Sequence, residues 1–101
     1  MSNRVVLSTA ANRDPKEIAS RISADSPIAA RGVMLAFSAR FRLLGEQPLS
    51  GRSAIETAQP GMRRMSNAPY VIFYRIKADR IQVVRILHGS RRLDDPHLYA
   101  R

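Results

Sequence analysis

Residues 69–92, PYVIFYRIKADRIQVVRILHGSRR, form the stretch that decides the fold. Two runs of β-branched and aromatic residues, Tyr70–Ile76 and Ile81–Leu87, favour pleated strands, and a short polar turn separates them. The pattern predicts a β-hairpin that ends in a His-Gly turn and two arginines. Arg75 and Arg85 interrupt runs that are otherwise apolar, so we expect one face of the hairpin to meet solvent or a partner.

The N-terminal residues predict a short strand and a first helix. Arg4–Thr9 is rich in strand-favouring residues. Asn12 or Asp14 can cap a helix that has Pro15 at its first position and runs to about Ala24.

A second helix is predicted from about Pro27 to Gly45, with Ser26 as its cap. Apolar residues recur along it at spacings of three and four and form one stripe: Ala30, Val33, Met34, Phe37, Phe41 and Leu44. Two helices joined by a tight turn form a hairpin whose apolar stripe must be buried, and the sheet is the available partner.

The segment between the helices and the β-hairpin predicts a loop over residues 46–60, with a helical turn near Ala54–Thr57, and a third strand at Gly61–Asn67. The element order is therefore β-α-α-β-β-β. We predict one α+β domain over residues 1–101, in which an N-terminal strand and an antiparallel helical hairpin pack on a small, mostly antiparallel sheet. The tail from Leu93 onward is expected to be only partly ordered.

Strand parity sorts the β-hairpin into two faces. A three-residue turn, Ala78–Arg80, places Tyr74 opposite Val84 and Phe73 opposite Arg85, whereas a two-residue turn would shift this pairing by one. With the first turn, the face covered by helices holds Tyr70, Ile72, Tyr74, Ile76, Gln82, Val84, Ile86 and His88.

The other face is predicted to be an open surface of mixed apolar and cationic side chains. It holds Val71, Phe73, Val83 and Leu87 beside Arg75 and Arg85. An acidic amphipathic segment of a partner protein would cover the apolar residues while its carboxylates pair with the arginines. The alternative is that the tail after Arg92 folds back over this face.

The charge is strongly positive and unevenly distributed. The chain has 17 basic and 8 acidic side chains in 101 residues, a net charge of +9, and 15 of the basic residues are arginine. Residues 60–92 alone hold 8 basic side chains and one acidic side chain. Such a field attracts nucleic acid or an acidic protein segment, and the arginine fork suits phosphate and carboxylate. A solvated basic surface is the alternative.

Composition also excludes several kinds of site. The chain has no cysteine, which excludes disulfides and thiolate metal sites. Two histidines and scattered carboxylates give no metal-ligand spacing, so we expect neither a metal nor another cofactor. No apolar run of about 18 residues and no export signal are visible, and we therefore expect no membrane association and a cytoplasmic location.

The order of several short motifs resembles the ParE/RelE superfamily of bacterial toxins. The resemblance covers about residues 4–95 and is greatest for the ParE-like branch. The segments that carry it are Glu17–Arg31, Pro48–Arg52 (PLSGR), Pro60–Arg64 (PGMRR), Pro69–Arg75 (PYVIFYR) and Leu87–Arg92 (LHGSRR).

The resemblance implies the toxin of a bacterial type II toxin–antitoxin pair, which poisons DNA gyrase without itself being an enzyme. A cognate antitoxin would neutralise it through an extended acidic segment, and a ribbon-helix-helix part of the antitoxin would carry the hetero-oligomer to operator DNA. Antitoxin contacts are expected at Phe73, Arg75, Arg85 and Leu87. Target contacts are expected at Arg63, Arg64, His88, Arg91 and Arg92.

The RelE branch implies an alternative, a ribosome-dependent messenger RNA endoribonuclease. Its candidate catalytic residues here are Arg64, Arg91 and His97, since cations can stabilise the charge that develops at phosphorus. Val71 and Met62 stand where RNA-cleaving members carry basic residues, which favours the ParE branch. A non-toxic, basic nucleic-acid-binding module is a further hypothesis, although few aromatic side chains are available for stacking.

Overall fold

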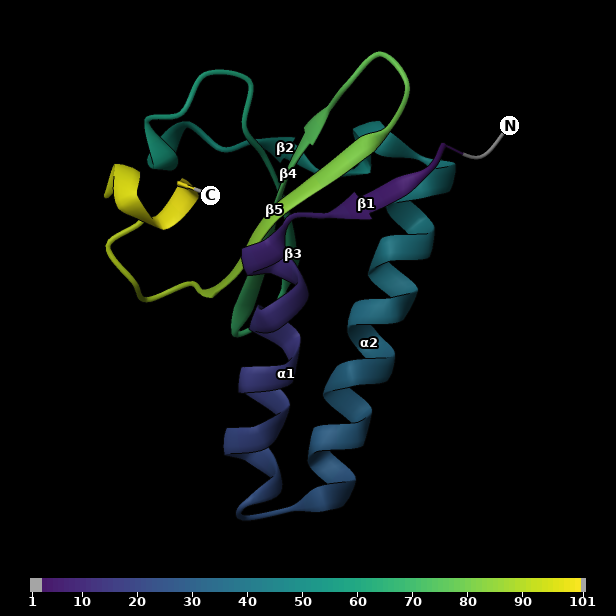
Figure 1. The fold of residues 1–101 in the computed structure, drawn as a ribbon, viewed down its shortest axis with the longest axis vertical. Coiled ribbons are helices and arrows are strands. Elements are labelled where there is room, and N and C mark those ends of the chain that lie inside the picture. The colour runs from purple at the N-terminus through teal and green to yellow at the C-terminus, as the bar shows by residue number, and fades with distance from the viewer. Residues whose placement is uncertain (1–2, 101) are drawn as a thin grey trace.

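The computed structural model describes residues 3–100, which form a helical hairpin and a five-stranded sheet (Figure 1). The helices and strands are β1 (Val5–Leu7), α1 (Thr9–Ser23), α2 (Pro27–Glu46), β2 (Arg52–Ser53), β3 (Arg63–Asn67), β4 (Tyr70–Ile76) and β5 (Ile81–His88). Short 3-10 turns lie at Pro48–Ser50, Ile55–Thr57 and Pro96–Tyr99. The predicted α+β class and element order are confirmed, and the two-residue strand β2 is additional.

The sheet has the strand order β1-β5-β4-β3-β2. β1 pairs with β5 in parallel, and every other neighbouring pair is antiparallel. The N-terminal strand therefore lies at one edge of the sheet and the loop strand β2 lies at the other.

Serine side chains set the start of both helices. Ser8 caps α1 by accepting a hydrogen bond from the Ala11 N–H at 3.0 Å, so α1 begins earlier than predicted and Pro15 lies inside it. Ser26 caps α2 as predicted and accepts from the Ala29 N–H at 3.1 Å.

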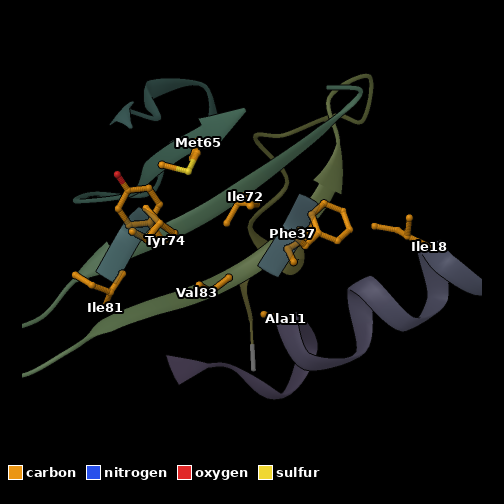
Figure 2. Close-up of a cluster of buried hydrophobic side chains, with 10 residues drawn as sticks. Ala11, Ile18, Phe37, Met65, Ile72, Tyr74, Ile81 and Val83 are labelled. Atoms are coloured by element: carbon orange, nitrogen blue, oxygen red, sulfur yellow. The ribbon is translucent and has the colours of Figure 1, made fainter. Parts of the chain in front are cut away.

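The helical hairpin covers one face of the sheet, and side chains from both layers form the main core (Figure 2). Ala30, Phe37 and Leu44 of the predicted α2 stripe are buried, whereas Met34 lies at its margin and is 36% exposed. The buried members of this core are Ala11, Ile18, Phe37, Leu44, Met65, Ile72, Tyr74, Ile81, Val83 and Ile86.

A β-bulge changes the predicted sorting of the β-hairpin. Phe73 opposes Arg85 as predicted, but Tyr74 opposes Val83 instead of Val84. One extra residue in β5 reverses the alternation of sides beyond it. Val83 consequently joins the helix-covered core, and Val84 packs on the opposite face.

The face opposite the helices is covered by the chain itself. Val71, Phe73 and Leu87 pack there with Ala54, Met62 and Leu98 in a second buried cluster. In Figure 1 the C-terminal turn lies beside the loop that precedes β3. The prediction of an open face is therefore wrong, and the alternative, a tail that folds back, is what the structure shows.

Candidate functional site

Arg85 belongs to a largely buried hydrogen-bond network. Its Nε and Nη2 donate to the two carboxylate oxygens of Asp14 at 2.8 and 2.9 Å, and its Nη1 donates to the Leu98 carbonyl at 2.9 Å. Asp14 also accepts the Ile86 N–H at 2.8 Å. The hydrogen bonding of Arg85 to the Asp14 carboxylate raises the pKa of Arg85 and outweighs the opposing effect of burial. Arg85 thereby joins α1, β5 and the C-terminal tail.

The four residues predicted to contact an antitoxin have different environments. Phe73 and Leu87 are 0% and 3% exposed, because the tail covers them, and the Tyr99 ring meets Phe73 edge-on at 5.8 Å. The Arg85 guanidinium donates its hydrogen bonds to Asp14 and to the Leu98 carbonyl. Arg75 is partly exposed, and its Nη1 donates to the Pro60 carbonyl at 3.3 Å.

Arg63 is held by partners at the edge of the sheet. Its Nη2 donates to the Gly51 carbonyl at 2.8 Å and its Nε to the Tyr74 hydroxyl at 3.3 Å, while that hydroxyl donates to the Pro48 carbonyl at 2.7 Å. A Cβ at Gly51 would lie 2.2 Å from the Arg64 carbonyl oxygen, so only glycine fits this approach. The PLSGR motif therefore fastens its loop to the sheet.

Arg64 forms an ion pair with Glu56, and its side chain is only 18% exposed. Burial by itself would raise the pKa of Glu56, but a backbone hydrogen bond and Arg64 together lower it. Arg52 adds a second cation, with its Nη1 3.8 Å from a Glu56 carboxylate oxygen. The charge of Arg64 is therefore partly compensated within the fold.

His88, Arg91 and Arg92 form the accessible end of β5 and the turn after it. The Nδ1 of His88 lies 2.7 Å from the Ser90 hydroxyl, and its ring meets Tyr70 edge-on at 5.6 Å. Arg92 donates to Asp94 at 3.1 Å in an exposed pair. These are the predicted target-contacting residues whose side chains remain exposed.

A cleft of about 310 Å³ lies between α1 and the end of β5. Arg91 and His88 line it from the strand side, and Glu17 and Arg21 line it from the helix side. Arg21 was not among the predicted site residues. Its signal was present, because Asp14, Glu17 and Arg21 recur at helical spacings of three and four.

The candidate ribonuclease residues do not share a cavity. Arg64, Arg91 and His97 each line a different one, and the His97 side chain is 92% exposed with its Nδ1 3.1 Å from Asp95. Within residues 3–100, no group of three potential His, Cys, Asp or Glu ligands gathers around a possible metal position. In the same range, no helix has the length and apolar character needed to cross a membrane.

The sequence pattern that describes the ParE toxin of the type II toxin–antitoxin system, parDE, matches residues 5–93. This chain belongs to the ParE toxin family. The match spans both helices and all five strands of this ParE-family chain, and it confirms the resemblance inferred from the motifs. A comparison with curated proteins found no significant match to the sequence.

Two solved structures share the fold of this ParE-family chain. The chromosomal ParDE toxin–antitoxin system from P. aeruginosa has a TM-score of 0.71 and 19% identity, and the match covers 86% of this chain and 96% of that chain. The toxin–antitoxin complex RelBE2 from Mycobacterium tuberculosis has a TM-score of 0.56 and 23% identity, with coverage of 87% and 99%. At these identities, the similarity establishes the fold alone.

Proposed function

We propose that this chain is the toxin of a type II toxin–antitoxin pair, that it poisons DNA gyrase in the cytoplasm, and that a cognate antitoxin neutralises it by direct binding. The match to the ParE toxin family over residues 5–93 carries the proposal. Both similar structures are described as toxin–antitoxin assemblies, which is consistent with an antitoxin partner here.

We place the target contact at the end of β5. His88, Arg91 and Arg92 are exposed around one turn, whereas Arg63 and Arg64 are held by partners inside the fold. Guanidinium groups suit an acidic protein surface or the DNA backbone beside it. In this proposal, Arg63 and Arg64 position the loop around Gly51, and the turn after β5 meets gyrase.

A mechanism without catalysis fits the geometry better than RNA cleavage does. A ribonuclease needs its cations and its acid or base around one phosphate, within hydrogen-bond reach of the reacting atoms. Arg64, Arg91 and His97 line three different cavities, and Arg64 is already paired with Glu56. The structure therefore offers no convergent catalytic set among the residues predicted for this reaction.

Expression of the chain in a bacterial host tests the proposal. We expect growth arrest with filamentation and a DNA-damage response while translation continues, and we expect relief when the antitoxin encoded by the adjacent reading frame is co-expressed. Arg91→Ala with Arg92→Ala should weaken the arrest, while the free energy of unfolding should change by only about 0.5 kcal/mol, as is usual for surface substitutions.

The matched control is Arg31→Ala with Arg42→Ala, which removes the same charge from exposed positions on α2. This double variant should stay toxic. Equal loss of toxicity in both double variants would show that only net charge matters. Rapid arrest of translation with cleaved messenger RNA would instead favour the ribonuclease.

A further inference from the structure

A groove of about 360 Å³ lies between the C-terminal half of α2 and the outer strands of the sheet. Its polar lining comes from Arg40 of α2, from Ser50 and Arg52 in the loop and β2, and from Arg64 and Ser66 of β3. Within residues 3–100, β2 pairs with only two residues of β3, and the rest of this β3 edge has no neighbouring strand. We call this cavity the β3-edge groove.

The β3-edge groove carries a net positive charge. Its lining includes three arginines and, among the described residues, no carboxylate. Glu56 pairs with both Arg52 and Arg64, so three cations share one anion. Arg40 forms no ion pair within residues 3–100. Glu46, the exposed last residue of α2, lies about 120° around the helix from Arg40 and does not line the groove. The groove is therefore suited to an anion.

Arg64 has a hydrogen-bond donor that the fold does not use. Its Nη1 donates to Glu56, but its Nε is buried and has no acceptor within residues 3–100. Among the described residues, it is the one buried side-chain polar atom without a partner. Because buried polar atoms are normally hydrogen-bonded, this donor needs an acceptor that the chain does not supply. The Ser50 and Ser66 hydroxyls add further donors to the lining.

The groove is framed before any ligand binds. The loop that supplies two of its lining residues is fastened to the sheet, because Arg63 donates to the Gly51 carbonyl at 2.8 Å and the Tyr74 hydroxyl donates to the Pro48 carbonyl at 2.7 Å. A site that is already ordered loses less conformational freedom when it binds. The basic side chains therefore surround a preformed cavity.

The groove lies at the same end of the sheet as the turn after β5. Asn67 of β3 pairs with Tyr70 of β4, and Tyr70 pairs with His88 of β5. Neighbouring strands are about 4.8 Å apart, so β3 and β5 are separated there by about 10 Å. Phosphates recur along one strand of B-DNA about every 3.4 Å of axis, so a duplex presents several phosphates over that distance. A linear polyanion can therefore reach both the groove and the turn, whereas a free phosphate cannot.

We propose that the β3-edge groove binds a backbone phosphate of the DNA that gyrase holds. The inference rests on the proposed function, since it names DNA as a second surface that the toxin meets in the gyrase complex. Arg40 and Arg52 would pair with the two free oxygens of the phosphate, and the Arg64 Nε would donate to one of them. The described lining has no His, Asp or Glu to act as a general base, so the contact would hold a strand without cleaving it.

Calorimetric titration of the purified chain with a short duplex DNA tests the inference without gyrase. Arg40→Gln with Arg52→Gln should weaken binding at least about tenfold and reduce the slope of log K against log salt by about 0.9, the value for one phosphate. Ser66→Asp, which adds a carboxylate to the groove and removes no guanidinium, should also weaken binding. Arg13→Gln with Arg31→Gln is the control, because it removes the same charge from exposed positions of α1 and α2 outside the groove. The control should change the affinity by less than about threefold.

The outcomes separate this inference from the proposed function. Absence of duplex binding by the unchanged chain, or equal weakening by the groove variant and the control, overturns the inference. Tighter binding of inorganic phosphate or of single-stranded RNA than of the duplex also overturns it, since the groove would then take a different ligand. If Arg40→Gln with Arg52→Gln still traps cleaved plasmid with gyrase as well as the unchanged chain does, the inference fails and the proposed function stands. If the groove variants lose duplex binding but the unchanged chain does not trap cleaved plasmid, the proposed function fails and the groove remains a DNA-backbone site.

Discussion

Removal of the Asp14 carboxylate should destabilise the fold strongly. In Asp14→Ala, Arg85 would lose two hydrogen bonds and its counter-ion, and the Ile86 N–H would lose its acceptor. Only the Leu98 carbonyl would still accept from the guanidinium. An uncompensated charge would then remain in a largely buried position.

The expected loss of unfolding free energy follows from the burial of the Asp14–Arg85 ion pair. Breaking a buried ion pair by removing one partner costs about 3–5 kcal/mol. The Asp14 side chain is 7% exposed and that of Arg85 is 18% exposed, so some water reaches the guanidinium and the lower figure applies, about 3 kcal/mol. A domain of this length has a free energy of unfolding of about 5–15 kcal/mol, so the loss is a large fraction of it.

Urea unfolding followed by far-ultraviolet circular dichroism measures this loss. Asp14→Leu combined with Arg85→Met should be less damaging than Asp14→Ala, since apolar replacement of both partners leaves no unpaired charge. Asp94→Ala, which breaks the exposed pair with Arg92, should change the free energy of unfolding by about 0.5 kcal/mol or less. A loss below about 1 kcal/mol in Asp14→Ala would refute the structural role assigned to Arg85.

Three further predictions follow from the packing. Gly51→Ala should lower the free energy of unfolding by about 1–3 kcal/mol in the same urea assay, because the new Cβ would meet the Arg64 carbonyl oxygen at 2.2 Å; an unchanged midpoint would contradict this. Leu98→Ala should cost about 2–5 kcal/mol and increase the binding of a hydrophobic dye as the second cluster opens, and no change in either would contradict the covered face. Burial, followed by the charge of Glu56, raises the pKa of Tyr99 to about 12, so the closed tail is fully stabilised below about pH 10 and loses that contribution as the pH rises through about 12. Ultraviolet titration should show this late ionisation, and Tyr99→Phe should abolish it.

The local sequence pattern was sufficient to predict most of the helices and strands. β4 was predicted with its observed bounds, because its strand-favouring residues begin after Pro69 and end before Lys77. α2 was predicted to within one residue, because Ser26 supplies the cap and the apolar stripe repeats at helical spacing. Such signals arise within a few residues of one another and therefore appear in a single sequence.

The covered sheet face could not be predicted in the same way. It depends on Leu98 reaching Phe73 across a long stretch of chain, and on Arg85 meeting Asp14, which lies 71 residues away. The bulge at β5 also exchanged Val83 and Val84 between the two faces, which parity alone does not reveal. Arg85 and Phe73 consequently looked accessible in the sequence but are held inside the fold.

The direct test of the central claim is a cleavage assay with purified DNA gyrase, supercoiled plasmid and this chain. We predict that the chain increases the amount of plasmid trapped in the cleaved form, that prior addition of the antitoxin prevents this, and that Arg91→Ala with Arg92→Ala reduces it. Absence of cleaved plasmid at concentrations that arrest growth, together with messenger RNA cut in purified ribosomes, would contradict the claim.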